Sequence, residues 1–200
     1  LKMSKIGLFG GTFDPIHFGH LMLAEQVLKE FSLDEIKFIP AGIPPHKTKK
    51  KVTDKQHRLN MVLLATKDNP RFSVSDYEIC NERLNYSYIT ISHFKEQNPK
   101  DEFFFIVGGD SFCNFPEWKN YRTLISLCTF IVVPRPGIEP TGYFEKFCGD
   151  EAPPRVFFLT GFSCGISSTA IRMQLKEGKE VSGQVPPSVE QYIKTNKLYI

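Results

Sequence analysis

Five consecutive apolar residues, Phe103 to Val107, run directly into a pair of glycines, and this segment limits the possible folds more than any other. Residues 6–11 form a second short apolar run that closes on glycines, and residues 129–134 form a third apolar run. A strand that is apolar on both faces must be covered on both faces, as in a parallel sheet flanked by helices. The sequence therefore predicts a doubly wound, Rossmann-like α/β fold with a parallel sheet.

Helix and strand patterns alternate along the rest of the chain. Residues 18–31 carry apolar side chains at helical spacing and lead to a strand at residues 36–40, which together form a β-α-β unit. Further strands are expected at residues 71–75, 103–108, 129–134 and 155–159, and further helices at residues 54–67, 86–97, 120–127, 168–176 and 187–195. We expect residues 1–200 to form a single domain, with its C-terminal helices from about residue 167 and a helix-bearing excursion at residues 134–154.

Composition excludes several classes of protein. The apolar share of 41% and the charged share of 24% are those of a globular domain, and no apolar run approaches the length of a membrane span. The five cysteines include no Cys-x-x-Cys pair, which argues for reduced, packing cysteines in a cytoplasmic protein. A net charge of +3 is too small to indicate nucleic-acid binding, although lysines crowd into residues 47–51.

The first strand leads into the most informative segment, residues 10–20, which reads Gly-Gly-Thr-Phe-Asp-Pro-Ile-His-Phe-Gly-His. Gly10 and Gly11 would let the backbone turn sharply and approach a ligand closely. The segment then feeds a helix N-terminus, where free amides and the helix dipole favour an anion. It lacks the Gly-Lys-Ser/Thr ending of a Walker A loop and is not a Gly-x-Gly-x-x-Gly fingerprint.

His17 and His20 lie three residues apart at the start of this helix, so both rings can face one side. Three interpretations are open for the pair. The histidines could be satisfied structural residues, or they could share a metal, although no third ligand has convincing spacing. The third interpretation is phosphate recognition, in which imidazole N–H groups donate to phosphoryl oxygens and Gly19 leaves room for a phosphate or an adenine.

A second helix start with exposed hydroxyls occurs at residues 166–172, which read Ile-Ser-Ser-Thr-Ala-Ile-Arg. Serine and threonine are favoured at helix N-termini, and Arg172 follows one turn later, able to fork onto phosphate oxygens. Taken alone, the segment is equally compatible with an ordinary capped helix and a surface arginine.

Together these two motifs resemble those of the nucleotidyltransferase superfamily, whose signatures are (His/Thr)-x-Gly-His and Ile-Ser-Ser-Thr-x-Ile-Arg. The first segment is similar to that of bacterial nicotinate mononucleotide adenylyltransferases, and the resemblance extends over nearly the whole chain, including the closing segment near residues 185–199. It implies transfer of the adenylyl group of ATP to nicotinate mononucleotide, with Mg²⁺ accompanying ATP and pyrophosphate released. It also implies one nucleotidyltransferase domain with no nucleic-acid or membrane partner, and it leaves a homo-oligomer open.

The resemblance carries specific residues over to this chain. It places His17, His20 and Arg172 in the catalytic set, and it places Gly10, Gly11, Thr12, Phe13, Gly108, Asp110, Ile166, Ser167, Ser168 and Thr169 around ATP. For the pyridine nucleotide it implies His46, Lys47, Tyr88, Ile89, Trp118 and Arg135. Arg58 also matches the family and is open to a structural role.

The chain departs from the family at one position in the pyridine pocket. The family commonly has Ser-Tyr-Thr where this chain has Ser-Tyr-Ile-Thr at residues 87–90, so Ile89 stands at the usual threonine position unless Thr90 takes over. The preference for the acid over the amide is therefore an open question. The alternatives to nicotinate mononucleotide adenylylation are a sister enzyme acting on nicotinamide mononucleotide or another phosphate acceptor, a non-catalytic nucleotide sensor, and an RNA-binding module.

Overall fold

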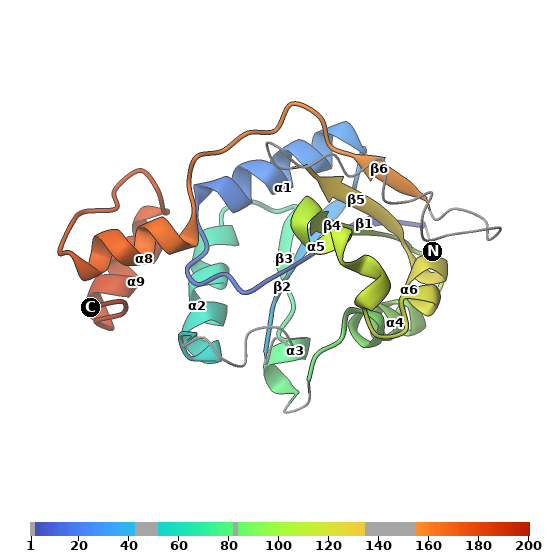
Figure 1. The fold of residues 1–200 in the computed structure, drawn as a ribbon, viewed down its shortest axis with the longest axis horizontal. Coiled ribbons are helices and arrows are strands. Elements are labelled where there is room, and N and C mark those ends of the chain that lie inside the picture. Colours follow the sequence, from blue (N-terminus) through green and yellow to red (C-terminus); the bar gives the residue numbers. More distant parts are fainter. Residues whose placement is uncertain (1–2, 43–51, 82–83, 135–154) are drawn as a thin grey trace.

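A six-stranded, entirely parallel sheet forms the centre of the computed structural model, which describes residues 3–42, 52–81, 84–134 and 155–200 (Figure 1). The strands are β1 (Lys5–Gly11), β2 (Glu35–Pro40), β3 (Phe72–Val74), β4 (Glu102–Gly108), β5 (Thr129–Val133) and β6 (Val156–Phe158). Their order across the sheet is β3-β2-β1-β4-β5-β6. The strand order reverses between β1 and β4, and a ligand of such a sheet binds at the carboxyl ends of the strands at that point.

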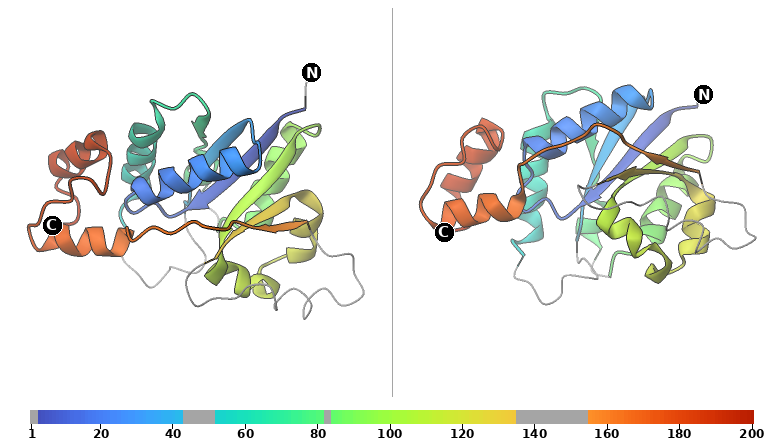
Figure 2. Two further views of the ribbon diagram at one scale, coloured as in Figure 1. Left: turned by 90° about the horizontal axis from the view of Figure 1, so that it is seen from above. Right: turned by 45° about the horizontal axis from the view of Figure 1, so that its top comes forward.

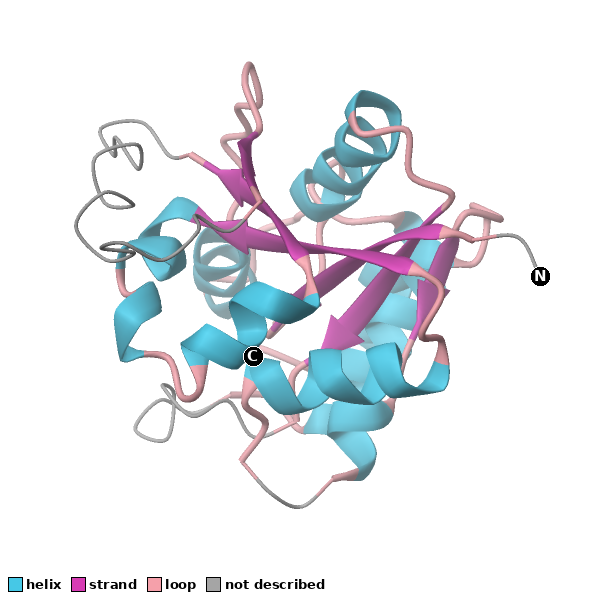
Figure 3. Cartoon of the chain, turned by 90° about the vertical axis from the view of Figure 1, so that its right-hand side faces the viewer, coloured by secondary structure: helices cyan, strands magenta, loops and turns pink. Residues whose placement is uncertain are grey.

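Helices cover both faces of this sheet, which confirms the doubly wound α/β prediction (Figures 2 and 3). One hydrophobic cluster joins the sheet to α1 (Phe18–Glu30), α2 (Lys55–Thr66), α8 (Ser168–Lys176) and α9 (Pro187–Thr195). The other cluster joins it to α4 (Ser87–Gln97) and α6 (Tyr121–Leu127), together with the short helices described next. Among the described residues, no helix is long and apolar enough to cross a membrane.

Each strand and helix expected from the sequence forms, and its ends lie within one residue of the expected ones. The sequence missed three short helical segments: α3 (Tyr77–Cys80), α5 (Gly109–Cys113) and the 3-10 helix η1 (Phe115–Glu117). Segments of one turn have no room for an apolar repeat, so periodicity cannot reveal them. The excursion expected at residues 134–154 lies almost entirely outside the described residues. Of the five cysteines, the four described are free.

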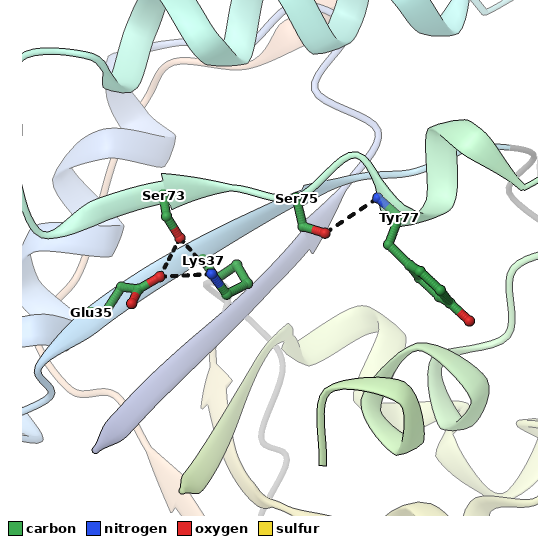
Figure 4. Close-up of polar contacts among 5 residues, drawn as sticks. All are labelled: Glu35, Lys37, Ser73, Ser75 and Tyr77. Atoms are coloured by element: carbon green, nitrogen blue, oxygen red, sulfur yellow. Dashed lines mark hydrogen bonds and ion pairs between the residues drawn. The ribbon is translucent and has the colours of Figure 1, made fainter. Parts of the chain in front are cut away.

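Polar side chains connect the edge of the sheet to α3 (Figure 4). The Lys37 ammonium on β2 donates to Glu35 Oε1 at 2.8 Å and to Ser73 Oγ on β3 at 2.8 Å, and Ser73 also donates to Glu35. Just beyond β3, Ser75 Oγ accepts a hydrogen bond from the backbone N–H of Tyr77 at 3.2 Å. The first group of contacts joins β3 to β2, and the last fixes the start of α3, which forms one wall of the cavity described below.

Gly42 follows β2 and packs against α3. A Cβ built on Gly42 would lie 2.0 Å from the carbonyl oxygen of Glu78, which is a backbone atom and cannot rotate away. Only glycine therefore allows the segment after β2 to approach α3 this closely.

We expect Gly42→Ala to lower the free energy of unfolding by about 1–3 kcal/mol, because the new methyl group must displace backbone. Urea unfolding followed by far-ultraviolet circular dichroism measures the change. Gly165→Ala is the matched control, since a Cβ there would meet no atom within 4 Å. Equal unfolding curves for Gly42→Ala and the unmodified chain would contradict this close approach.

Candidate active site

The starts of α1 and α8 meet on one loop, although the two helices begin 150 residues apart in the sequence (Figures 1 and 2). Ser168 Oγ donates to the carbonyl oxygen of Pro15 at 2.9 Å. Arg172 donates from Nη1 to the carbonyl oxygen of Asp14 at 2.6 Å and from Nη2 to Thr169 Oγ1 at 3.3 Å. The two segments that the sequence singled out are thus in direct contact. They place two helix N-termini, with their free amides and positive dipole ends, side by side.

The glycine pair does not make the turn that the sequence led us to expect. Gly10 and Gly11 are the last two residues of β1, and neither has a positive φ. The reversal comes two residues later, where Phe13 has a φ of 48°. A Cβ on Gly11 would lie 2.8 Å from the Phe13 ring, so the glycine makes space for the phenylalanine to fold back over the strand end.

His17 and His20 stack on one another, with ring centroids 3.7 Å apart and an interplanar angle of 27°. His20 Nδ1 accepts a hydrogen bond from the backbone N–H of His17 at 3.2 Å, which satisfies one amide at the start of α1. Phe13 meets the His20 ring edge-on at 5.0 Å. His17 is 6% exposed, and its Nδ1 has no hydrogen-bond partner. The His20 side chain therefore has a structural role in starting the helix.

Both imidazoles are neutral at physiological pH. Burial lowers the pKa of His17 to about 4, and burial together with the adjacent His17 lowers the pKa of His20 well below its usual value. Because His20 Nδ1 already accepts a hydrogen bond, the ring proton of neutral His20 lies on Nε2. The pair therefore offers N–H donors without a full positive charge.

Gly19 does not leave space for a ligand, contrary to the sequence-based expectation. A Cβ on Gly19 would lie 2.9 Å from Cys164 Sγ and 3.0 Å from His17 Nδ1, so the protein's own side chains fill that position. Nor does a metal cluster surround the histidines: in the described part of the chain, no three His, Cys, Asp or Glu side chains gather as metal ligands do.

Arg58 is a residue whose importance the sequence did not establish. Its side chain is 1% exposed, and it donates to the carbonyl oxygens of Thr12 at 2.7 Å, Thr53 at 3.0 Å and Gly42 at 3.2 Å. It therefore fixes the positions of the loop after β1, the segment after β2 and the start of α2 relative to one another. The residue type alone gave no signal, because an arginine in an amphipathic helix is usually exposed.

Asp14 performs a similar task for the C-terminal end of the chain. Its Oδ1 accepts from the Tyr199 hydroxyl at 2.7 Å, and its Oδ2 accepts from the backbone N–H of Thr53 at 3.4 Å. Burial and the neighbouring Asp14 raise the pKa of Tyr199, so this hydroxyl keeps its proton. Asp14, Arg172 and Tyr199 also line a cavity of about 410 Å³ beside α8, together with Lys176 one turn further along.

A larger cavity of about 480 Å³ opens at the carboxyl ends of β1 and β4, at the switch point of the sheet. Of the predicted site residues, it is lined by Gly10, Gly11, Gly108 and Trp118. The Trp118 indole contacts the Phe105 ring at 6.1 Å and the Phe115 ring at 5.4 Å between centroids, which fixes one wall. Asp110 is exposed on α5, next to the lining residue Ser111.

The predicted residues on α4 lie beside this cavity rather than in its wall. Tyr88 and Ile89 are not among the lining residues, and Ile89 is 39% exposed. Tyr86, Ser87 and Thr90 line the cavity in their place. A helix turns by about 100° per residue, so a one-residue shift in assignment moves a side chain to another face. Three further predicted residues, His46, Lys47 and Arg135, lie outside the described residues.

Glu78 lines the same cavity and has no counterpart among the predicted site residues. Thr90 Oγ1 donates to Glu78 Oε1 at 2.7 Å. Nothing in the sequence around Glu78 marks it, because α3 is one turn long and its side chain reaches the cavity only through the packing of α3 on β2 and α4.

Comparison with known proteins finds a matching family model and several similar named proteins. The family model for cytidylyltransferase-like proteins matches residues 8–174. A Thermoanaerobacter protein named probable nicotinate-nucleotide adenylyltransferase is 43% identical, covering 98% of this chain and 94% of its own. A protein of the same name from Clostridium acetobutylicum is 39% identical over 99% of this chain and 100% of its own.

Solved structures of similar fold include the Plasmodium falciparum nicotinic acid mononucleotide adenylyltransferase complexed with NaAD. It is 22% identical to this chain, with a TM-score of 0.79 over 98% of this chain and 97% of that one. The same enzyme complexed with APC superposes with a TM-score of 0.77. At this identity the likeness establishes the fold.

We expect Arg58→Met to lower the free energy of unfolding by about 3 kcal/mol or more, because three carbonyl oxygens lose their donor and each buried unsatisfied group costs about 1–3 kcal/mol. Urea unfolding measures the change. Arg71→Met, at an exposed side chain, is the control and should unfold like the unmodified chain. A cost for Arg58→Met below that of an average surface substitution would show that the loops do not depend on this guanidinium.

Proposed function

Because this chain belongs to the cytidylyltransferase-like family, and within it to the nicotinate-nucleotide adenylyltransferases, we propose that it transfers the adenylyl group of ATP to nicotinate mononucleotide. The products are nicotinate adenine dinucleotide and pyrophosphate, a step of NAD biosynthesis. The similarity to relatives of this name over the full length of both chains is the observation that carries the proposal. Residues 1–200 then act as one nucleotidyltransferase domain, with ATP and the pyridine mononucleotide as its small-molecule partners.

The reaction we propose is a direct in-line attack. The 5′-phosphate oxygen of nicotinate mononucleotide bonds to the α-phosphorus of ATP, and the bond from that phosphorus to the oxygen of the leaving pyrophosphate breaks. The attacking phosphate is already an anion, so the reaction needs no general base. Catalysis then depends on positioning the two phosphates and on stabilising charge in the transition state.

Two helix starts provide the groups for that stabilisation. Neutral His20 donates from Nε2 to a phosphoryl oxygen, and His17, stacked against it, fixes the orientation of its ring. The hydroxyls of Ser167, Ser168 and Thr169, the amides of the α8 start, and Arg172 face the same triphosphate. The contact of Ser168 and Arg172 with residues 14–15 supports this assignment, because it fixes the distance between the two groups of donors.

The divalent metal in this proposal is Mg²⁺ that arrives with ATP. Phosphate oxygens and water are the ligands Mg²⁺ prefers, and it commonly keeps several waters rather than entering an all-protein cage. When bound, it neutralises charge on the phosphates.

The cavity at the switch point is where we place the pyridine nucleotide. Trp118 lines it with an aromatic surface suited to stacking on a pyridine ring, and Gly108 leaves its floor open, since a Cβ there would meet nothing within 4 Å. His46, Lys47 and Arg135 remain proposed contacts on this side. A volume of about 480 Å³ lies in the range of small-molecule pockets.

Pyrophosphate release with ATP and each of three acceptors tests the function. We expect nicotinate mononucleotide to be the preferred acceptor over nicotinamide mononucleotide and phosphopantetheine. A preference for either of the other two would make the chain a sister enzyme. ATP binding without any pyrophosphate release would make it a nucleotide sensor, and salt-sensitive binding of RNA would favour the nucleic-acid alternative.

Replacement of His20 tests the proposed role of its side chain. We expect His20→Ala to lower kcat by about 100-fold or more while changing the affinity for ATP by only a few-fold, because the donor acts on charge that develops in the transition state. Steady-state kinetics and isothermal titration of ATP give the two numbers. His57→Ala is the control, since His57 bonds to the Tyr192 hydroxyl at 2.9 Å on the α2–α9 side. Equal losses in turnover and ATP affinity would reduce His20 to a binding residue.

A further inference from the structure

Glu78 occupies a position in the proposed acceptor cavity that the reaction described above does not use. It lies on α3 and lines the cavity together with Gly108 and Trp118. The start of α3 is fixed by the hydrogen bond from Tyr77 N–H to Ser75 Oγ (Figure 4). A carboxyl group in the wall of a pocket for a charged acceptor must affect which acceptors fit.

The surroundings of Glu78 supply hydrogen bonds but little opposite charge. Thr90 Oγ1 on α4 donates to its Oε1 at 2.7 Å, and the backbone amide of Gly42 also donates to the carboxyl group. None of the ion pairs formed among the described residues includes Glu78. The carboxyl group is thus held in place by two neutral donors.

The charged and titratable groups around Glu78 lie on α2, on α4 and in the wall of the cavity. Arg58 on α2 contributes a weak attraction, and its guanidinium is already bonded to three carbonyl oxygens. The Lys55 ammonium donates a hydrogen bond to the carbonyl oxygen of Ile79 at 2.6 Å. Glu117 and Lys119 line the same cavity as Trp118. His93 on α4 stacks on Tyr77, with ring centroids 3.9 Å apart.

Burial outweighs these attractions and raises the pKa of Glu78 to about 7. Because the pKa of this carboxyl group is raised, its neutral form persists up to about pH 7. Below pH 7 the side chain is therefore mostly a neutral acid that can donate a hydrogen bond, and above pH 7 it is mostly a carboxylate that can only accept.

We propose that Glu78 is a specificity-determining residue: its neutral form admits a pyridine carboxylate, and its ionised form disfavours that carboxylate relative to a pyridine carboxamide. A carboxylate on the ligand is repelled by a second carboxylate but accepts a hydrogen bond from a carboxylic acid. A carboxamide is neutral and can donate to the ionised side chain. This inference rests on the acceptor cavity assigned under the proposed function.

The measurement is the ratio of kcat/KM for nicotinate mononucleotide to that for nicotinamide mononucleotide, taken between about pH 6 and about pH 8, around the pKa of Glu78. Both acceptors carry the same 5′-phosphate and react with the same ATP, so the titration of those groups cancels in the ratio. We expect the ratio to fall up to about ten-fold over this range, because about nine-tenths of Glu78 is neutral near pH 6 and about one-tenth near pH 8.

Three variants test whether Glu78 is the group whose titration changes this ratio. Glu78→Gln keeps the shape of the neutral acid and should hold the ratio at its low-pH value across the range. Thr90→Val removes the hydroxyl that favours the ionised form and should move the midpoint to higher pH. Glu117→Gln, at an exposed residue of the same cavity wall, is the matched control and should leave the midpoint unchanged.

The outcomes distinguish failure of the inference from failure of the proposed function. A ratio that does not change with pH, or one that changes equally in Glu78→Gln, overturns the inference while the adenylyl transfer stands. A midpoint that moves with Glu117→Gln and not with Thr90→Val overturns it as well, because the titrating group would then be another. Absence of pyrophosphate release with both acceptors overturns the proposed function and the inference with it.

Discussion

The buried guanidinium of Arg58 holds together the segments from which the site is built. Its three hydrogen bonds end on carbonyl oxygens of the loop after β1, the segment after β2 and the start of α2. The carbonyl groups of Thr12 and Gly42 lie just beyond the ends of β1 and β2, and that of Thr53 lies just before α2. Buried carbonyl groups need hydrogen-bond donors. One fixed cation with a planar fork satisfies all three, and it thereby sets the separation between the loop after β1 and the segment after β2 that packs against α3.

The convergence of α1 and α8 depends on that frame. The loop after β1 is held from one side by Arg58, and from the other Ser168 and Arg172 of α8 bond to the carbonyl groups of residues 14–15. Two positive helix ends then lie beside each other, which is unfavourable in the absence of an anion and favourable in the presence of a polyphosphate. The neutral histidine pair fits such a site, because it adds donors without adding to the repulsion. Under the proposed function, these helix ends and side chains hold hydrogen-bond donors in fixed positions around the phosphates of ATP.

Sequence patterns predicted the regular elements well and their contacts poorly. Long apolar runs and helical periodicity located each expected strand and helix to within one residue, whereas α3, α5 and η1 were too short to leave a pattern. The assignment of Gly10 and Gly11 to a turn was wrong because Phe13 makes the reversal, and Gly19 proved to accommodate Cys164 rather than a ligand. On α4, Ser87, Thr90 and Ile91 line the cavity and Ile89 does not, a difference that only the rotation of the helix settles.

The amino-acid sequence by itself determined the sheet, its two covering layers and the two loop-to-helix segments rich in glycine, histidine and hydroxyl groups, because those features depend on residues close together in the chain. The tertiary structure decided which groups meet: Arg58 with three loops, Arg172 with Asp14, and Glu78 with Thr90 in the cavity wall. It also decided the charge states, since the pKa values of His17 and Glu78 follow from burial. Burial and long-range contact arise from packing of segments far apart in the sequence, and no local pattern encodes them.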